Sequence, residues 1–159
     1  MRSIKQKLID FSLLETASET WRSQYKRIIT TNGCFDLLHW GHIAYLQQAR
    51  SLGDALICAV NADKTVTELK GSSRPIFKDT IRAAQLASLE CVDYVTIFSE
   101  ETPELFLSIV KPLIHVKGGD YEGLEIPEKK ILEAIGSQLI CLPFIKGYST
   151  TQIIQRLIK

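Results

Sequence analysis

The stretch TTNGCFDLLHWGH, Thr30 to His42, decides the fold because it joins the end of a strand to the start of a helix. The apolar and β-branched run 28–31 predicts the strand. The segment from His42 to Leu52, followed by Gly53, predicts the helix, since glycine commonly follows a helix C-terminus. Two histidines therefore stand where a strand gives way to a helix.

The rest of the chain repeats this alternation. Further β-branched or apolar runs predict strands near residues 55–60, 94–98, 113–117 and 138–142, with helical patterns between them. Such a repeat indicates a parallel sheet covered on both faces and joined by right-handed crossovers. We therefore expect an α/β fold, a Rossmann-like three-layer sandwich with a parallel five-stranded sheet. Ligands bind such sheets beyond the carboxyl ends of the strands, where strand order reverses, which is where residues 30–42 fall.

Length and composition restrict the class of protein. The 159 residues, 45% hydrophobic and 23% charged, predict one soluble globular domain preceded by a helical packing segment, residues 1–26. With 19 basic and 18 acidic residues, no overall field favours nucleic acid or a membrane surface. We find no membrane span or secretory signal and expect a cytoplasmic protein. The four cysteines lack zinc-ligand spacing, and we expect reduced, buried thiols at Cys34, Cys58, Cys91 and Cys141.

The tetrapeptide His39-Trp40-Gly41-His42 carries the most chemical information. Free backbone N–H groups and the dipole of a helix start favour an anion, and Gly41 lets that anion approach the backbone. Imidazole donors there would stabilise charge that develops on a phosphoryl group. The structural alternative is that the two histidines cap the helix and pack against Trp40.

Three further motifs suit a nucleotide. LKGSSRP (69–75) predicts a flexible basic loop able to close over a triphosphate, or else a solvated loop. VKGGDY (116–121) follows the fourth strand, where glycines let backbone groups face a planar base, or simply form a turn. YSTTQII (148–154) begins an amphipathic helix whose capped start can also hold phosphates.

These residues carry a family resemblance. NGCFDLLHWGH (32–42) resembles the first motif of the cytidylyltransferase-like nucleotidyltransferases, whose HxGH is shared with class I aminoacyl-tRNA synthetases. Together with VNAD (60–63), Arg82 and the following ASLECVDYV (87–95), the three motifs above resemble one subgroup, the D-glycero-β-D-manno-heptose 1-phosphate adenylyltransferases. The resemblance covers nearly everything from Arg27 to Ile158. It implies the HxGH nucleotidyltransferase fold over residues 27–159.

The resemblance, read with the local chemistry, assigns site residues. The catalytic group is His39, His42 and Lys70, and Asp36, Arg74 and Arg82 are assigned to the phosphorylated substrate. Nucleotide-binding positions are Thr31, Asn32, Gly33, Cys34, Phe35, Gly41, Lys117, Gly118, Gly119, Asp120, Tyr121, Ser149, Thr150 and Thr151. Several have structural alternatives: Phe35 as a core residue, Asp36 as a brace for its loop or a positioner of magnesium, and Arg82 paired with Asp79 within one helix. His115 we interpret as structural.

No pair of carboxylates forms a metal cage, so no protein metal site is expected and Mg²⁺ should be delivered with the nucleotide. The expected reaction is transfer of AMP from ATP to D-glycero-β-D-manno-heptose 1-phosphate, giving ADP-heptose and pyrophosphate for the lipopolysaccharide inner core. ATP is favoured over CTP because FIKGYSTT (144–151) has Lys146 where many CTP-using relatives carry arginine, as in RTEGIST.

Other functions stay open at this point. One is a CTP-dependent cytidylyltransferase acting on glycerol 3-phosphate or phosphoethanolamine, and another is a non-catalytic nucleotide-binding regulatory module. A truncated aminoacyl-tRNA synthetase is disfavoured, because the chain has no strongly basic face for tRNA. Related domains commonly pair, so a homodimer fits the sequence. The family also occurs fused to a sugar kinase, which this length cannot contain, so the sugar phosphate would be made elsewhere.

Overall fold

Five parallel strands form a single sheet in the order β3-β2-β1-β4-β5. They are β1 (Ile28–Gly33), β2 (Ala55–Asn61), β3 (Tyr94–Phe98), β4 (Ile114–Gly118) and β5 (Gln138–Leu142). The structure is a computed structural model that describes residues 2–119, 126–143, 145, 147–148 and 150–157. The expected α/β fold, with its five parallel strands, is confirmed, and each expected strand lies within two residues of the observed one.

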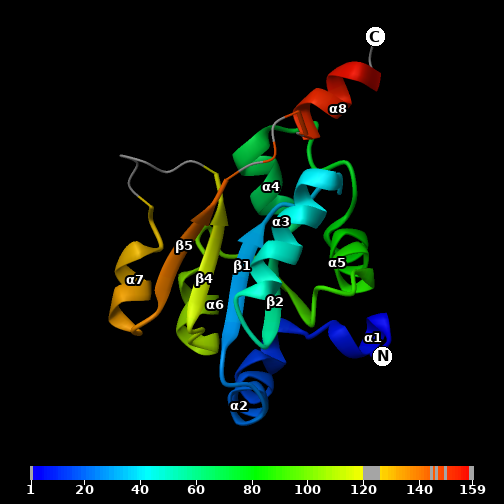
Figure 1. The fold of residues 1–159 in the computed structure, drawn as a ribbon. Helices are drawn as coiled ribbons and strands as arrows, with labels where there is room; N and C mark the ends of the chain where they lie inside the picture. Colours follow the sequence, from blue (N-terminus) through cyan, green and yellow to red (C-terminus); the bar gives the residue numbers. More distant parts are fainter. Residues whose placement is uncertain (1, 120–125, 144, 146, 149, 158–159) are drawn as a thin grey trace.

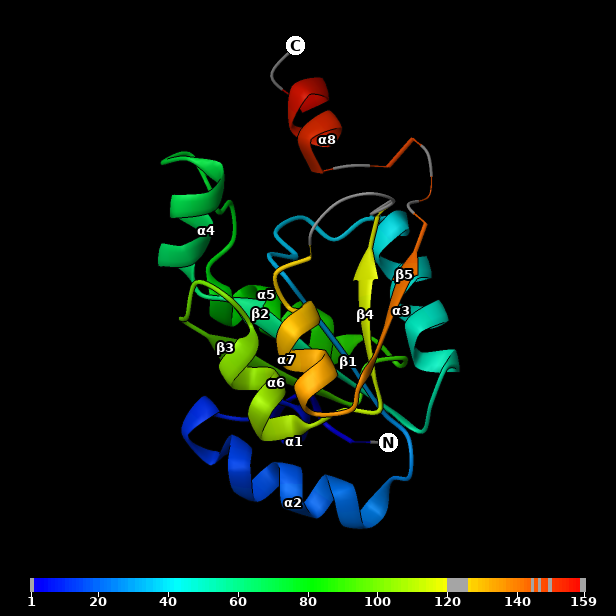
Figure 2. The same cartoon turned by 90° about the vertical axis from the view of Figure 1, so that its left-hand side faces the viewer.

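Helices cover both faces of the sheet, which gives three layers (Figures 1 and 2). On one face, α3 (Trp40–Ser51) and α5 (Asp79–Ser88) pack Leu46 and Leu86 against β-strand residues such as Leu56 and Val95. On the other face lie α2 (Leu14–Gln24), α6 (Glu104–Val110) and α7 (Lys129–Ala134). The short α1 (Ile4–Lys7), α4 (Asp63–Lys70) and the C-terminal α8 (Thr150–Leu157) lie around these layers. Because the sheet is buried on both faces, the amino-acid sequences of its strands are continuous apolar runs.

The central strand β1 lies between β2, which follows it in the chain, and β4, which comes more than 80 residues later. Thr30 pairs with Ile57 on one side and with His115 on the other. The chain order reverses between β1 and β4, so this is the topological switch point at which such sheets bind ligands. The motifs TTNGCFDLLHWGH and VKGGDY follow the carboxyl ends of these two strands.

His115 is structural, as expected. Its side chain is fully buried in β4, with Nδ1 2.8 Å from Thr30 Oγ1 on the neighbouring strand. Burial, with a smaller contribution from the charge of Lys117, lowers the pKa of His115 to about 3. The ring is therefore neutral at physiological pH and serves as a hydrogen-bonding element of the core.

The N-terminal segment wraps around the β3 edge of the sheet. Ile9 N donates to Val95 O at 2.9 Å, and Lys7 Nζ donates to Leu89 O and Val92 O at 2.9 and 2.7 Å. After the short 3-10 turn 11–13, α2 places Trp21 against Tyr94 with ring centroids 4.6 Å apart. The segment thus covers an edge that would otherwise present unpaired backbone groups.

Two expectations from the sequence, on membrane-spanning helices and on the cysteines, can be compared with the structure. No helix in the described ranges is long and apolar enough to cross a membrane. All four cysteines are described and all are free thiols, as expected. Their expected burial is wrong for three of them, because Cys141 is exposed on an edge strand and Cys34 and Cys91 are half-buried; only Cys58 in β2 is fully buried.

Candidate active site

A pocket of about 880 Å³ opens at the carboxyl ends of β1 and β4. Most of the residues expected to form a site line it: Asn32, Gly33, Cys34, Phe35, Asp36, His39, Gly41, His42, Lys70, Arg74, Lys117, Gly118, Thr150 and Thr151. The sequence interpretation missed other lining residues: Tyr45, Asn61, Leu69, Glu101, Thr102, Pro103, Pro127, Glu128, Ile145, Gly147 and Tyr148. The sheet topology therefore brings motifs from five separate segments to one cavity.

Three expected nucleotide-binding or substrate-binding residues do not line the pocket. Thr31 is fully buried, and its Oγ1 lies 2.6 Å from the Tyr45 hydroxyl, which in turn donates to Val116 O. Gly119 is buried and donates its N–H to Leu142 O on β5. Arg82, the third, is treated below. Asp120, Tyr121 and Ser149, with Lys146, lie outside the described residues.

The two histidines stand together at the start of α3. His39 is the N-cap residue and makes no side-chain cap hydrogen bond, so the expected alternative of histidine capping is not what holds the ring. Its ring stacks on that of His42 with centroids 3.9 Å apart and planes 27° apart, and Phe35 meets His42 edge-on at 5.7 Å. Nδ1 of each histidine is buried without a hydrogen-bond partner among the described residues. Trp40 is half exposed.

Both imidazoles are neutral at physiological pH. Burial, and then the neighbouring His39, lowers the pKa of His42 to about 4, and burial also lowers the pKa of His39. A neutral imidazole still donates one N–H and accepts at its other nitrogen. Negative charge on a bound ligand opposes the shift, because it favours the protonated ring. The pair is thus a compact set of donors that an anion would complete.

Gly41 sits where a side chain would collide with this pair. A Cβ built there would lie 3.0 Å from His39 Nδ1 and Cε1 and 3.2 Å from Tyr148 Cβ. Glycine at this position therefore leaves the first turn of α3 open and lets the ring of His39 stay stacked. The expected approach of an anion to the backbone at Gly41 stays a prediction.

The turn after β1 is held by the buried side chain of Phe35 and by the carboxylate of Asp36. Phe35 adopts a left-handed backbone conformation with φ 47° and packs in the core, as its structural alternative predicted. Asp36 is buried, and it accepts from Arg74 Nε at 2.6 Å and from the backbone N–H groups of Ile76 and Phe77. Burial alone would raise the pKa of Asp36, but these hydrogen bonds and the guanidinium outweigh it and lower the pKa.

Asp36 is thus a brace. It ties the 74–77 loop to the end of β1, as its structural alternative predicted, and its assignment to the phosphorylated substrate stays a prediction. Arg74 lines the pocket, but its Nε donates to Asp36. Its backbone carbonyl accepts from the hydroxyl of Thr67 on α4. Lys70, at the end of α4, is exposed and lines the pocket with no ion pair among the described residues.

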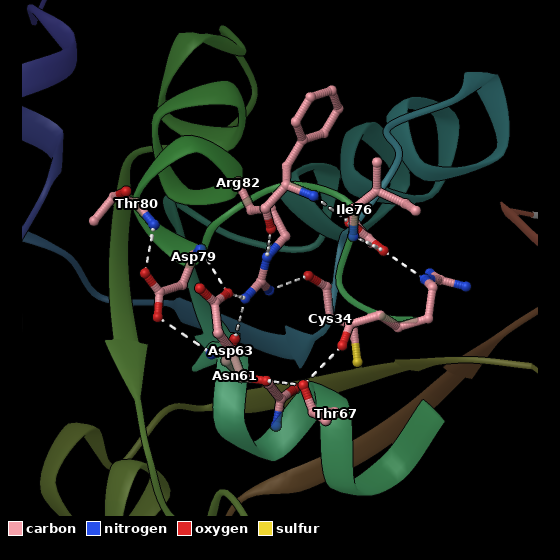
Figure 3. Close-up of polar contacts among 11 residues, drawn as sticks. Cys34, Asn61, Asp63, Thr67, Ile76, Asp79, Thr80 and Arg82 are labelled. Carbon is pink, nitrogen blue, oxygen red and sulfur yellow. Dashed lines mark hydrogen bonds and ion pairs between the residues drawn. The ribbon is translucent and has the colours of Figure 1, made fainter. Parts of the chain in front are cut away.

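Arg82 is a buried hub whose hydrogen bonds are with the protein itself, and its expected contact with substrate stays a prediction. The side chain has no exposed surface. Nε donates to Phe77 O at 2.9 Å, Nη1 donates to Cys34 O, and Nη2 donates to Asn61 O and Asp63 Oδ1 at 2.7 and 2.8 Å (Figure 3). One guanidinium therefore joins the ends of β1 and β2, the start of α4 and the 74–77 loop.

The structural alternative, an ion pair of Arg82 with Asp79, is wrong. Asp63 pairs with Arg82, whereas Asp79 exchanges hydrogen bonds with Asp63: each carboxylate accepts from the other's backbone N–H, at 2.8 and 3.2 Å. This exchange satisfies a free N–H at the start of each of α4 and α5. Asp63 ends the VNAD motif, so a signal for it was present in the sequence although no role was assigned.

The wall formed by β4 holds a buried ion pair. Lys117 Nζ donates to Glu128 Oε1 at 2.6 Å and to Asn32 Oδ1 on β1 at 3.3 Å. Glu128 is only 4% exposed, and its Oε2 has no partner among the described residues. Glu128 precedes α7 and belongs to no motif, so nothing in the sequence marked it.

The described residues supply no protein cage for a metal. No group of three or more His, Cys, Asp or Glu side chains is placed to hold an ion in the parts of the chain that the structure describes. Of the carboxylates that line the pocket, Asp36 binds the 74–77 loop and Glu128 binds Lys117 through Oε1.

The site lies at the switch point of a parallel sheet, with HxGH at the start of α3, and the sequence around it matches a known family over most of the chain. Residues 30–156 match the model of the cytidylyltransferase-like proteins. The chain belongs to the cytidylyltransferase-like family. The family resemblance expected from the sequence is thereby confirmed.

Relatives within the family are similar over nearly the whole of this chain. The bifunctional protein HldE of a Nitratiruptor species is 49% identical over 148 residues, which cover 93% of this chain and 31% of HldE. HldE of Aliarcobacter butzleri is 48% identical over 147 residues, 92% of this chain and 30% of HldE. The chain thus spans about three tenths of the length of these curated relatives.

Solved structures of related fold support the same placement. The lipopolysaccharide core biosynthesis protein of Thermoplasma volcanium superposes with a TM-score of 0.60 at 29% identity, covering 77% of this chain and 98% of that one. The pantoate-beta-alanine ligase of Francisella tularensis gives a TM-score of 0.62 at 16% identity over 92% of this chain and 75% of its own, which shows likeness of fold alone.

Proposed function

We propose that this chain is a nucleotidyltransferase that transfers AMP from ATP to D-glycero-β-D-manno-heptose 1-phosphate, yielding ADP-heptose and pyrophosphate for the lipopolysaccharide inner core. The observation that carries the proposal is the stacked His39–His42 pair at the open start of α3, inside the pocket at the β1–β4 switch point. Catalysis at this site means charge stabilisation and positioning, for which the pair is suited.

The reaction requires no protein nucleophile. An oxygen of the sugar 1-phosphate attacks the α-phosphorus of ATP in line, the bond from that phosphorus to the bridging oxygen breaks, and pyrophosphate leaves. The attacking phosphate is already ionised, so a general base would add little. We assign His39 and His42 to hydrogen bonding with phosphoryl oxygens whose charge grows in the transition state, and Lys70 to the triphosphate.

The starts of two helices, α3 and α8, complete the proposed binding site for the triphosphate. The first turn of α3 offers N–H groups that the capping side chain does not use, and Thr150 and Thr151 bring the start of α8 to the same pocket. Tyr148 lies beside His39, with ring centroids 6.5 Å apart. We propose that the triphosphate lies between these two helix starts.

Magnesium is proposed to arrive with the nucleotide, which fits the absence of a three-residue cage among the described residues. Bound to the triphosphate, the ion would supply charge neutralisation on the leaving pyrophosphate. The protein's own residues would then bind the oxygens that the ion leaves free. The proposed reaction is cytoplasmic, because ATP and sugar phosphates are cytoplasmic metabolites.

The choice of substrate rests on the relatives. Several are named HldE and share 41–49% identity with this chain, and the protein of Thermoplasma volcanium is named for lipopolysaccharide core biosynthesis. These names support, for this chain, a step that activates a heptose phosphate. A CTP-dependent enzyme would share the mechanism and differ in the base it accepts.

The test is pyrophosphate release with Mg²⁺, crossing ATP and CTP with heptose 1-phosphate, glycerol 3-phosphate and phosphoethanolamine. We expect release only with ATP and heptose 1-phosphate, and its loss in His42→Ala. Release that depends on CTP would overturn the substrates but keep the mechanism. No release in any pairing, despite measurable nucleotide binding, would instead support the regulatory module.

A further inference from the structure

The wall of the pocket opposite the histidines contains a carboxylate, one oxygen of which has no hydrogen-bond partner among the described residues. Glu128 is only 4% exposed and uses Oε1 on Lys117, which leaves Oε2 buried without a partner among the described residues. Lys117 has three N–H donors, of which two are used, on Glu128 and Asn32. A buried polar atom without a partner is costly, so such an atom at a pocket wall indicates a group that binds there.

The chemistry of that group is restricted. A carboxylate oxygen only accepts, so its partner must carry an O–H or N–H donor, which phosphoryl oxygens lack. A neighbouring Lys117 donor can serve an acceptor on the same ligand. A hydroxyl both donates and accepts, so two adjacent hydroxyls of a sugar match the Lys117–Glu128 pair. The terminal torsion of a glutamate is soft, which lets the carboxylate turn toward such a ligand.

The Lys117–Glu128 pair lies apart from the histidines and the start of α3, where the phosphates are proposed to bind. Ile114 and Val116 of β4 pack on the face that carries α3, so Lys117 points toward the opposite face. Glu128 leads into α7, whose Leu132 packs on that opposite face. Figure 2 shows α3 and α7 on the two sides of the sheet. The Lys117–Glu128 pair therefore lies across the pocket from His39 and His42, beside Asn32.

We propose that Glu128, held by Lys117, is a specificity-determining residue that accepts a hydrogen bond from a ring hydroxyl of the sugar phosphate acceptor. The inference rests on the proposed function and deepens it, since it names the group of the acceptor that the protein recognises, a ring hydroxyl. Acceptors without that hydroxyl leave the buried carboxylate unpaired, and discrimination of this kind is strong because the unpaired group is buried.

The test compares Glu128→Gln with wild type in steady-state kinetics, using heptose 1-phosphate and its monodeoxy analogues. The amide keeps the shape and one oxygen but replaces an acceptor with a donor. We expect the KM for heptose 1-phosphate to rise about tenfold, with the KM for ATP and kcat changed less than about twofold. One deoxy analogue should cost wild type about tenfold in kcat/KM and cost the variant nothing further.

Glu133→Gln is the matched control. It makes the same substitution on α7 at an exposed position that pairs only with Lys129 among the described residues, at 4.0 Å, and it should leave every constant unchanged. Should Glu128→Gln melt early because Lys117 loses its partner, the double variant Lys117→Met/Glu128→Met removes the buried charges together and should show the same rise in acceptor KM.

Each other outcome overturns the inference. An unchanged acceptor KM would make the ion pair structural only, and a rise confined to the KM for ATP would assign the contact to the ribose. A shift in the Mg²⁺ concentration needed for activity would assign it to the metal. Wild type inactive with every sugar 1-phosphate would overturn the proposed function as well, whereas an active wild type beside an unaffected variant would overturn this inference alone.

Discussion

Replacing Arg82 by lysine separates two roles that are difficult to distinguish by activity alone. If Arg82 contacted the acceptor phosphate, Arg82→Lys would keep the positive charge, preserve stability and raise mainly the KM for the sugar phosphate. The structure shows instead a guanidinium that makes four hydrogen bonds to Phe77 O, Cys34 O, Asn61 O and Asp63 Oδ1.

The size of the effect follows from these contacts. A lysine ammonium cannot reproduce the planar fork and reaches about two of the four acceptors, so two buried acceptors lose a charged donor. At about 1.5 kcal/mol for each such bond, the free energy of unfolding should fall by about 3 kcal/mol. With a urea slope of about 2 kcal/mol/M for a chain of this size, the unfolding midpoint should fall by about 1.5 M.

The assay is urea unfolding followed by circular dichroism, with pyrophosphate release measured below the transition. Arg22→Lys is the control, because Arg22 donates to Ile109 O and Val110 O from an exposed position and should change the free energy of unfolding by less than about 0.5 kcal/mol. A midpoint within about 0.3 M of wild type, combined with a raised KM for the sugar phosphate, would refute the hub and restore the substrate contact.

Three further predictions concern the histidines and the glycine between two of them. His42→Ala should lower kcat about 10²-fold in pyrophosphate release while leaving the melting curve near that of wild type; an unaltered kcat would remove His42 from catalysis. Gly41→Ala should displace the His39 ring by a few tenths of an ångström and lower kcat about tenfold, with little change in stability by urea unfolding. His115 stays neutral when folded, with a pKa of about 3 against about 6.5 unfolded, so its contribution is present above pH 6.5 and is lost as pH falls. At pH 5 this loss is about 2 kcal/mol, and His115→Gln should show that much less destabilisation between pH 7 and pH 5; equal losses would contradict the assignment.

The sheet could be predicted from sequence because strands buried on both faces carry one consistent pattern. The run from Ile28 and the run from Ala55 are apolar or β-branched nearly throughout, and their alternation with helical segments fixes parallel pairing. The position of the pocket followed from the same pattern, since it depends on where strand order reverses. His39, Gly41 and His42 could be found because their spacing is local.

The rest of the site depends on contacts between distant segments. Arg82 was expected to meet substrate because the family resemblance implied it, and only the structure shows Cys34 O and Asn61 O accepting from its guanidinium. Asp36 similarly meets the 74–77 loop across some 40 residues of sequence. Glu128 carries no local signal, because its significance comes entirely from facing Lys117.

The place of β1 in the sheet also governs when the pocket can exist during synthesis. Its pairing with β2 joins residues less than 30 apart, but its other partner begins at Ile114, and the pocket is closed by threonines at 150 and 151. A nascent chain can therefore form half of the sheet early, while a ligand-binding cavity must wait until β4 and residues 150 and 151 have been made and have packed against β1. Nucleotide can stabilise only the finished domain, so ligand binding acts as a late check on a fold whose first half is already made.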